Sequence, residues 1–259
     1  MTDTIFMIHG MCAGAWAWSN FKGFFEAQGY RCVTPTLRYH DIDPGDAPNP
    51  QLGFTSVLDY ADDLEQEIRH LDVKPIVMGH SMGGLLAQML GTRGLAKALV
   101  LLTPASPAGI MGLKLSTIRA FLSSFTQWGF WRKPMRLTFN EAVYTVFHVM
   151  SSEEQRALYD KFVYESGRAG CEIGLWLCDT KGASRVDESQ VTCPVLVIAG
   201  TEDRMTPASV VRKVAKKYKA VSTYKEFTNH AHWVLGEPGW ETITEYISGW
   251  LDQTVRKGG

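Results

Sequence analysis

Ser81 stands between two glycines at a spacing that suits nucleophilic chemistry. The run Gly79-His80-Ser81-Met82-Gly83 follows an apolar stretch and precedes a helical pattern. A strand that turns directly into a helix strains its corner residue, and glycines two positions before and after it leave the room that the turn needs. The same turn points the serine hydroxyl toward a helix N-terminus, where backbone N–H groups favour developing negative charge. The motif therefore predicts a nucleophilic serine.

A carboxylate and two histidines follow in the order that this chemistry requires. A serine hydroxyl is a weak nucleophile at neutral pH and needs a base, which in turn needs an orienting acid. Glu202 and Asp203 come after one apolar run, and His230 and His232 come after the next. Because the carboxyl ends of parallel strands meet at one edge of a sheet, these side chains can approach the serine. We expect Asp203 to be the acid and Glu202 to be a solvated loop charge.

The two histidines lie two residues apart in a chain that has seven. The apolar run Trp233-Val234-Leu235 directly follows His232 and can shield an imidazole from water. We therefore predict that His232 is the base and that His230 is a loop residue that hydrogen-bonds nearby backbone. A metal site is disfavoured, because no further carboxylate or imidazole is spaced to complete a set of ligands.

A serine nucleophile also needs two backbone N–H donors where the carbonyl oxygen of a substrate becomes charged. We expect one donor to be Met82, directly after the serine. The second is expected from the loop after the first strand, where Gly10 lets the backbone approach closely and places the N–H of Met11. We interpret His9 as a residue that orders this loop, and His80 as a packing residue or part of a pocket wall.

Six short apolar runs predict strands, and helical patterns lie between most of them. The runs are apolar throughout rather than alternating, which is typical of parallel strands buried on both faces. Helical patterns cover residues 54–71 and 207–218, and Pro238 is expected near the first position of a last helix. The sequence therefore predicts an α/β fold with a doubly wound, mostly parallel sheet of about six strands. The predicted strands are residues 5–8, 31–34, 75–79, 98–103, 195–199 and 222–227.

One connection is far longer than a crossover between strands needs. Residues 105–192 separate two predicted strands, are rich in aromatic residues and carry mainly helical patterns. We predict that they form a helical cap on a core made of residues 1–104 and 193–259; a second layer of ordinary core is the alternative. Aromatic and methionine side chains predict an apolar pocket that adapts in shape. The predicted pocket residues are Gly10, Cys12, Trp16, Trp128, Trp131 and Trp233.

The composition of the chain limits which classes of binding partner and which compartment are expected. The 259 residues carry a formal net charge of -1, so no excess of positive charge favours nucleic acid or an anionic membrane. A small basic cluster, Arg132, Lys133 and Arg136, is either a solvated surface or an attraction for a carboxylate-bearing substrate. No apolar run approaches the roughly 20 residues of a membrane helix, and the N-terminal residues do not resemble a signal peptide. Five cysteines without disulfide spacing favour a reducing compartment. We expect a cytoplasmic monomer or homodimer with a small-molecule ester substrate.

Together these motifs resemble the α/β-hydrolase superfamily. The loop HGMCAGAW at residues 9–16 looks like that of the small serine esterases related to plant methyl esterases and hydroxynitrile lyases. The segment AGTEDRMTP at residues 199–207 and the later histidine–tryptophan pair extend the resemblance over essentially the whole chain. The resemblance implies acyl transfer to water through a serine-bound acyl intermediate, without a cofactor. It implies a triad of Ser81, Asp203 and His232 and oxyanion donors at Met11 and Met82.

Two departures separate the chain from the lyases of that group. Those enzymes resemble this loop but have threonine where this chain has Gly10 and lysine where it has Trp233, and a cyanohydrin needs a cation near its departing cyanide. Ser81, in place of an aspartate, also argues against epoxide hydrolases and dehalogenases of the same fold. Hydrolysis of small to medium carboxylic esters is therefore expected. A lactone or C–C bond hydrolase with the same triad, and a ligand-binding receptor of the same fold, are the alternatives.

Overall fold

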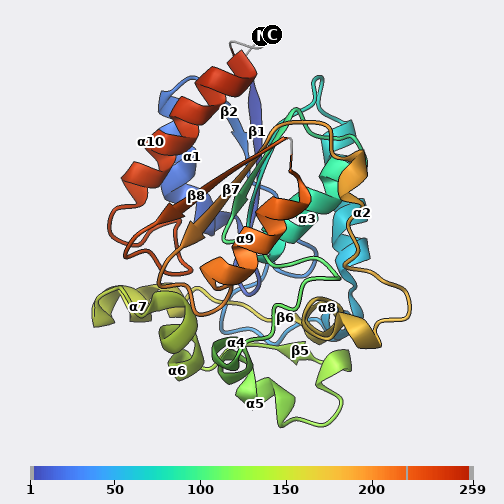
Figure 1. Cartoon of the computed structure of the whole chain (residues 1–259). Coiled ribbons are helices and arrows are strands. Elements are labelled where there is room, and N and C mark those ends of the chain that lie inside the picture. The colour runs from blue at the N-terminus through green and yellow to red at the C-terminus, as the bar shows by residue number, and fades with distance from the viewer. Residues whose placement is uncertain (1–2, 220, 257–259) are drawn as a thin grey trace.

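Six parallel strands form one sheet in the computed structural model, which describes residues 3–219 and 221–256 (Figure 1). The order across the sheet is β2-β1-β3-β4-β7-β8, and every neighbouring pair is parallel. Each strand begins and ends within one residue of its predicted range, so the predicted sheet is confirmed. The strands are β1 (Thr4–Ile8), β2 (Arg31–Val33), β3 (Ile76–His80), β4 (Ala98–Leu102), β7 (Val195–Gly200) and β8 (Ser222–Phe227).

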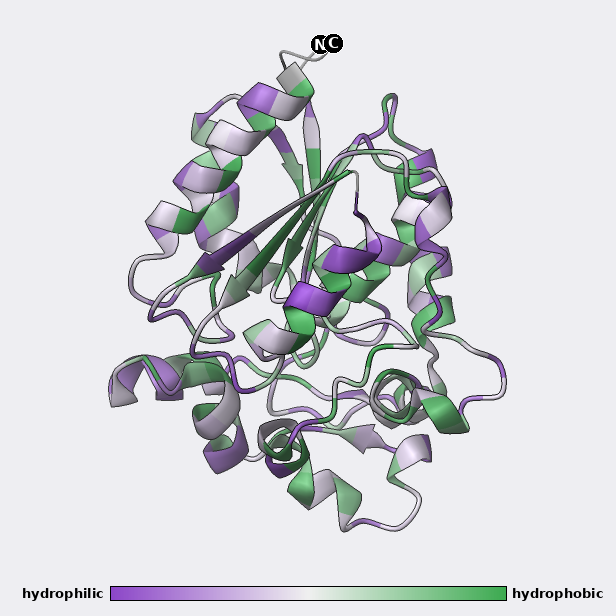
Figure 2. Cartoon of the chain, viewed as in Figure 1, coloured by the Kyte–Doolittle hydropathy of each residue, from purple (hydrophilic) through white to green (hydrophobic). Residues whose placement is uncertain are grey.

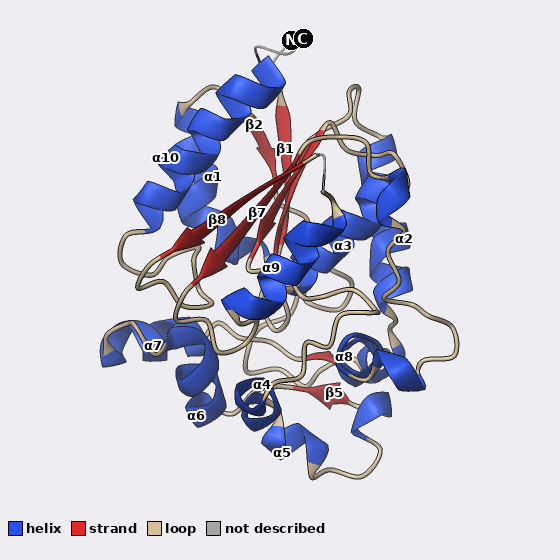
Figure 3. Cartoon of the chain, viewed as in Figure 1, coloured by secondary structure: helices blue, strands red, loops and turns tan. Residues whose placement is uncertain are grey.

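Helices cover both faces of this sheet (Figures 1 and 3). Along β1, Ile5 and Met7 belong to one hydrophobic core, and Phe6 and Ile8 belong to the other. Successive strand side chains point to opposite faces, so a strand buried on both faces must be apolar at every position. One core is closed by α1 (Ser19–Ala27) and α10 (Trp240–Leu251), and the other by α2 (Val57–Arg69), α3 (Met82–Thr92) and α9 (Ala208–Lys217).

The helix ends follow local signals, with one correction. Ser56 caps α2 in a reciprocal capping box with Asp59, which is the arrangement that satisfies orphan backbone groups at a helix start. Pro238 was expected near the first position of the last helix, but α10 begins at Trp240, after Gly239 with φ of 89°. Pro238 therefore lies outside the helix, because the left-handed glycine separates it from the first turn.

Residues 105–192, here called the insert, connect β4 to β7, although these two strands are neighbours in the sheet. The insert lies across the end of the sheet to which β7 and β8 point, opposite the chain termini (Figure 1). A two-stranded antiparallel sheet joins its helices. Its helices and strands are α4 (Leu115–Ala120), α5 (Leu122–Phe125), η3 (Phe130–Arg132), β5 (Pro134–Met135), α6 (Phe139–Ala142), η4 (Val143–Phe147), α7 (Ser152–Tyr159), β6 (Glu165–Ser166), α8 (Gly167–Gly174), η5 (Trp176–Cys178) and η6 (Glu188–Gln190).

Three short helices complete the described chain: η1 (Ala15–Trp18), η2 (Pro50–Phe54) and η7 (Asp252–Arg256). Of these, η2 contacts both η3 and α8 of the insert. None of the helices in residues 3–219 and 221–256 is both long and apolar enough to cross a membrane.

Candidate active site

Ser81 occupies the turn between β3 and α3. Its backbone has φ of 54° and ψ of -118°, a conformation that non-glycine residues adopt at a cost and that recurs at functional turns. The flanking glycines permit the turn. A Cβ on Gly79 would lie 2.1 Å from the carbonyl oxygen of Gly83, and a Cβ on Gly83 would lie 2.1 Å from that of Ile8. Any side chain at either position would collide with backbone, so the sequence signal has a direct steric cause.

The structure brings the three predicted triad residues into one hydrogen-bonded chain. The Oγ of Ser81 lies 2.9 Å from Nε2 of His232, and Nδ1 of the same ring lies 2.8 Å from Oδ2 of Asp203. The three residues come from the loops after β3, β8 and β7, which end at one edge of the sheet. Because the carboxylate can only accept, Nδ1 of His232 carries its proton and Nε2 is free to accept from the serine.

The loop after β7 holds the Asp203 carboxylate in position. Its Oδ1 accepts hydrogen bonds from the N–H groups of Met205 and Thr206, both at 2.8 Å. The hydroxyl of Thr206 lies 2.9 Å from both Oδ2 and the carbonyl oxygen of Thr103. Burial alone would raise the pKa of Asp203, but His232 and these hydrogen bonds lower it overall. The acid therefore stays ionised, whereas the neighbouring Glu202 is exposed as expected.

The sequence analysis did not predict a role for Thr206, although its spacing from Asp203 is typical of a known turn. An aspartate that accepts from backbone N–H groups two and three residues later is a recurrent turn, and Thr206 stands three residues after Asp203. The contact of its hydroxyl with Thr103 depends on a strand end more than 100 residues earlier. That part of the site is visible only in the fold.

His230 does not face Ser81. Its Nδ1 lies 2.9 Å from Oε1 of Glu237, a fully buried carboxylate that also accepts from the N–H of Ala231. We expected His230 to bond nearby backbone, and it bonds this side chain instead. The contacts of Glu237 with His230 and Ala231 link the two ends of the loop that carries His232.

The loop after β1 lies directly against Ser81. A Cβ on Gly10 would lie 3.0 Å from the Cβ of Ser81, so glycine allows this approach. Nε2 of His9 accepts from the N–H of Leu37 at 3.1 Å, and its Nδ1 donates to the carbonyl of Gly10 at 2.8 Å. Burial lowers the pKa of His9 to about 3, so the ring stays neutral. His9 therefore orders this loop, as the sequence indicated.

His80 packs against His232 and bonds its backbone. Its Nε2 donates to the backbone carbonyl of His232 at 2.8 Å, and its ring centroid is 4.9 Å from that of His232. Burial and the adjacent His232 lower the pKa of His80 to about 3. The His80 ring is therefore neutral, and its hydrogen bond holds the backbone of His232 in place. His80 also lines the wall of a cavity.

A second buried network ties the insert to the core beside this loop. The carboxylate of Glu165 accepts from Nε2 of His40 at 3.1 Å, from the hydroxyl of Tyr60 at 2.7 Å and from the N–H of Ser166 at 2.6 Å. Nδ1 of His40 donates to the carbonyl of Arg38 at 3.0 Å. Both ring nitrogens of His40 therefore face oxygen acceptors. Attraction between the two groups raises the pKa of His40 and lowers that of Glu165 against the effect of burial, which favours the charged imidazolium.

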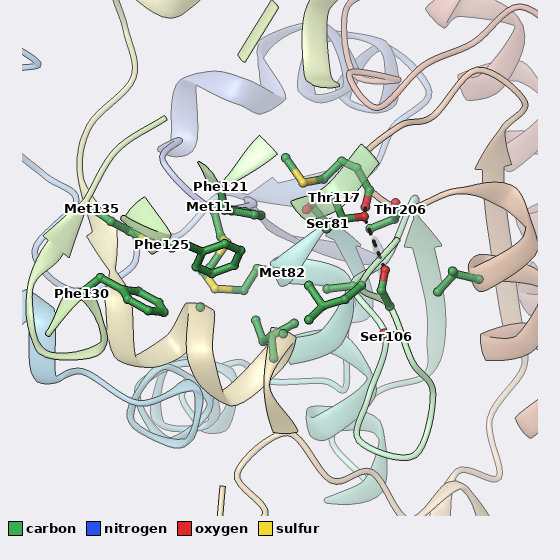
Figure 4. Close-up of a pocket in the computed structure, with 18 residues that line it drawn as sticks. Met11, Ser81, Met82, Ser106, Thr117, Phe121, Phe125, Phe130, Met135 and Thr206 are labelled. Carbon is green, nitrogen blue, oxygen red and sulfur yellow. Dashed lines mark hydrogen bonds between the residues drawn. The ribbon is translucent and has the colours of Figure 1, made fainter. Parts of the chain in front are cut away.

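Two apolar cavities meet at Ser81. The larger runs under the insert and contains about 740 Å³ of space free of protein atoms, its opening to solvent included. Phe121, Phe125, Phe130 and Met135 stand toward one end of it, with Ser81 toward the other (Figure 4). The smaller, of about 460 Å³, is lined by the ring of His232 and by Trp233. Among the described residues, no Asp, Glu, Lys or Arg lines either cavity.

Three of the six predicted pocket residues lie elsewhere. Gly10, Cys12 and Trp233 line the smaller cavity. Trp16 instead packs on the outer side of Trp233, at 5.7 Å between ring centroids, and lines a separate cleft.

Trp128 and Trp131 are on the outside of the insert, 86% and 38% exposed. The expectation that they line the pocket was wrong. A helical pattern alone does not determine which face of the insert turns inward, and phenylalanines occupy that face.

The remaining polar groups offer little further chemistry near Ser81. Within the described residues, no group of three or more His, Cys, Asp or Glu side chains could hold a metal ion. Burial raises the pKa of the Cys12 thiol to about 12, so this cysteine of the smaller cavity remains protonated.

Comparison with known proteins agrees with this fold. The sequence profile of the alpha/beta hydrolase family matches residues 5–240. The chain therefore belongs to the alpha/beta hydrolase family.

One curated plant protein matches part of this chain, and two solved structures share its fold. Methylesterase 3 of Arabidopsis thaliana is 32% identical over 87 residues, which is 33% of this chain and 32% of that protein. The chain thus matches about a third of the length of this curated relative. The crystal structure of another Arabidopsis methylesterase superimposes with a TM-score of 0.72 at 13% identity, over 97% of this chain and 99% of the other. A pyrethroid hydrolase from Sphingobium faniae gives 0.70 at 18% identity, over 97% and 98%. These structures share the fold.

Proposed function

We propose that this protein hydrolyses small to medium uncharged carboxylic esters through an acyl intermediate on Ser81. The observation that supports this most strongly is the unbroken chain of hydrogen bonds from Asp203 through His232 to Ser81, which ends where two apolar cavities meet. A nucleophile, a base and an orienting acid in that geometry suit acyl transfer. The methylesterase relative agrees with an ester substrate.

In the first half of the reaction, His232 takes the proton of Ser81 as Oγ attacks the ester carbonyl. The carbonyl oxygen becomes an oxyanion, which the backbone N–H groups of Met11 and Met82 stabilise. The proposal rests on two placements: α3 begins at Met82, so its first N–H groups have no partner within the helix, and the Gly10 backbone lies against Ser81. Preorganised donors of this kind are each worth about 10²–10³ in rate.

The first half ends when the oxyanion collapses: the bond between the carbonyl carbon and the alcohol oxygen breaks, and the imidazolium of His232 gives its proton to that oxygen. In the second half, water enters, and His232 removes a proton from it as its oxygen attacks the acyl carbon. The bond between that carbon and Oγ breaks, and Ser81 regains its proton. Asp203, held ionised by its loop, stabilises the imidazolium in both halves. Only water is consumed.

The lining of the two cavities supports a separate place for each half of the substrate. The alcohol must leave beside His232, which protonates it, and His232 lines only the smaller cavity. The acyl group therefore occupies the larger cavity among the phenylalanines. Apolar walls without formal charge favour uncharged substrates, because an ion would lose its water there without gaining a partner. Small alkyl esters of apolar or aromatic acids fit this division, and the insert acts as a cap that covers them.

The proposal is tested by removing the nucleophile. Ser81→Ala should lower kcat for a chromogenic ester by at least about 10³-fold, since loss of a triad serine removes the covalent route. The variant should unfold at the same denaturant concentration as the parent, because the change deletes one oxygen. Labelling by a serine-directed phosphonate should disappear with it. Comparable ester turnover in this variant would refute the assignment.

The neighbouring histidines provide a matched control. His232→Gln should abolish turnover, whereas His230→Gln should retain it, because its ring faces Glu237. A panel of esters and lactones, assayed with both variants and the parent, distinguishes an esterase from a lactonase. A ligand-binding receptor would bind panel members without turnover.

A further inference from the structure

The insert exposes large apolar side chains on the outside of the molecule. Within the described residues, eight of the nine exposed large hydrophobic side chains belong to the insert. The ninth, Phe54, belongs to η2, which contacts η3 and α8 of the insert. The rest of the described surface has none. The eight in the insert are Met111, Leu115, Ile118, Leu122, Trp128, Trp131, Leu175 and Leu177.

The α4–α5 segment is oriented with its aliphatic side chains toward solvent. Leu115 and Ile118 lie three residues apart on one face of α4, Leu122 is the first residue of α5, and Leu115 is 87% exposed. Thr117 and Ala120 are buried on the opposite face. A helix of a soluble protein normally has the reverse pattern. In Figure 2 the ribbon of α5 carries hydrophobic residues at the end of the molecule opposite the chain termini.

Basic residues predominate in this part of the insert. Residues 105–140 contain five basic residues and no Asp or Glu, although the whole chain has a net charge of -1. The next residue, Glu141, is half-buried and accepts hydrogen bonds from the N–H and the hydroxyl of Ser123 in α5. Arg136 is partly buried and binds the carbonyl oxygens of Pro44 and Tyr159. The other four, Lys114, Arg119, Arg132 and Lys133, are exposed among the apolar side chains.

The same segment forms the outer wall of the larger cavity. Gly112 and Leu113 line the cavity between exposed Met111 and Leu115. Ile173 and Gly174 line it directly before exposed Leu175. The exposed apolar residues therefore frame the cavity that ends at Ser81.

We propose that this face of the insert, residues 111–133 with Leu175 and Leu177, docks on an anionic lipid surface. Apolar side chains enter the boundary between headgroups and acyl chains, and the cations remain at the level of the phosphates. A second copy of the chain fits less well, because a two-fold dimer would bring this cationic face against itself. The chain-wide charge balance indicated no membrane partner, but it averages over this local excess. Docking on lipid does not depend on the proposed function. If the protein is also an esterase, docking brings it to ester substrates dissolved in the lipid phase.

Flotation of the full-length protein with vesicles tests the proposal. The protein should float with vesicles of phosphatidylglycerol and phosphatidylcholine, bind pure phosphatidylcholine much more weakly, and dissociate at high salt. Arg132→Gln with Lys133→Gln should weaken partitioning into the anionic vesicles by roughly 30-fold, at about fivefold per cation. The matched control, Lys213→Gln with Lys216→Gln, removes two exposed charges from α9 and should leave partitioning unchanged.

Leu115→Gln with Leu122→Gln isolates the apolar contribution. This pair should reduce vesicle binding at least tenfold and leave the turnover of a small water-soluble ester unchanged, because neither residue lines a cavity. Ser81→Ala should bind vesicles like the parent, so failure of docking and failure of the esterase proposal are distinguishable. Absence of flotation, equal binding to both vesicle types, or an equal effect of the α9 control would overturn the proposal. The proposal would also be overturned if the parent bound no vesicles but formed a concentration-dependent dimer that the Leu115→Gln, Leu122→Gln variant does not form.

Discussion

The region around His232 and the region around His40 each contain a buried histidine paired with a buried carboxylate. The ring-to-oxygen distances are 2.8 Å for His232 with Asp203 and 3.1 Å for His40 with Glu165. The histidines differ in what their other ring nitrogen faces. In His40 it donates to a backbone carbonyl, whereas in His232 it faces the hydroxyl of Ser81.

A carbonyl can only accept a hydrogen bond, so Nδ1 of His40 keeps its proton. The raised pKa of His40 and the lowered pKa of Glu165 favour a second proton on Nε2, opposite an ionised carboxylate. A hydroxyl both donates and accepts, so His232 can take a proton and return it. Burial and a carboxylate partner are therefore not sufficient for a general base. The second partner of the ring decides whether the pair joins two parts of the fold or moves a proton.

Among the changes that test this contrast between the two carboxylates, the largest effect is expected from altering the one beside His232. Asp203→Asn should lower kcat by about 10⁴-fold, because the amide no longer holds Nδ1 protonated and no longer stabilises the imidazolium. A stopped-flow or steady-state assay with a chromogenic ester measures the kcat of this variant and of the parent.

Glu237→Gln provides the matched control for that variant, since it makes the same change 2.9 Å from the neighbouring His230. Its turnover should remain within about tenfold of the parent. If Glu237→Gln lost as much activity as Asp203→Asn, the contrast between the pairs would be wrong.

An intermediate effect, on stability rather than turnover, is expected at the other pair. Glu165→Gln should destabilise the protein by about 3–5 kcal/mol, because it leaves the imidazolium of His40 buried without its counter-ion. Urea unfolding measures the loss of unfolding free energy.

A double-mutant cycle with His40→Gln should show coupling between the two changes. Folded Glu165→Gln should still react with a serine-directed phosphonate; a variant that folds normally but has lost labelling would place Glu165 in the catalytic machinery.

The smallest effect is the pH dependence of that stability. Burial opposes charge on both partners, yet their mutual attraction raises the pKa of His40 above 6.5 and lowers that of Glu165 below 4.5. The contribution of His40 is complete below about pH 6.5 and is lost as pH rises through its raised folded-state pKa. The contribution of Glu165 is complete above about pH 4.5 and is lost as pH falls through its lowered folded-state pKa.

The pair should therefore stabilise the fold most between about pH 4.5 and 6.5. Unfolding free energies of the parent and of the His40→Gln, Glu165→Gln double variant, measured across that range, should differ most inside this window. A difference that does not change with pH would show that the pair is not ionised.

The sequence predicted most of what local patterns determine. Strands buried on both faces are apolar throughout, and the turn at Ser81 requires glycines, so both leave a signal within a few residues. The order of Asp203 and His232 after Ser81 follows from the same edge of the sheet. These features need no knowledge of distant contacts.

Contacts between distant segments were not predictable in this way. His40 and Glu165 are 125 residues apart, and nothing in either segment indicates the partner. Trp128 and Trp131 were expected inside because aromatic residues usually prefer burial. Which face of the insert turns inward depends on how it packs on the core, and a single sequence does not contain that information.

β4 and β7 lie side by side although residues 103–194 separate them along the chain. Joining them closes a long loop and costs chain entropy that only the finished contacts recover. Ser81 and His232, 151 residues apart, meet only after this closure, because β8 in turn builds on β7. An isolated strand, helix or half of the sheet therefore cannot bring His232 to Ser81. If the proposed function holds, ester turnover measures the fraction of chains whose sheet is fully assembled.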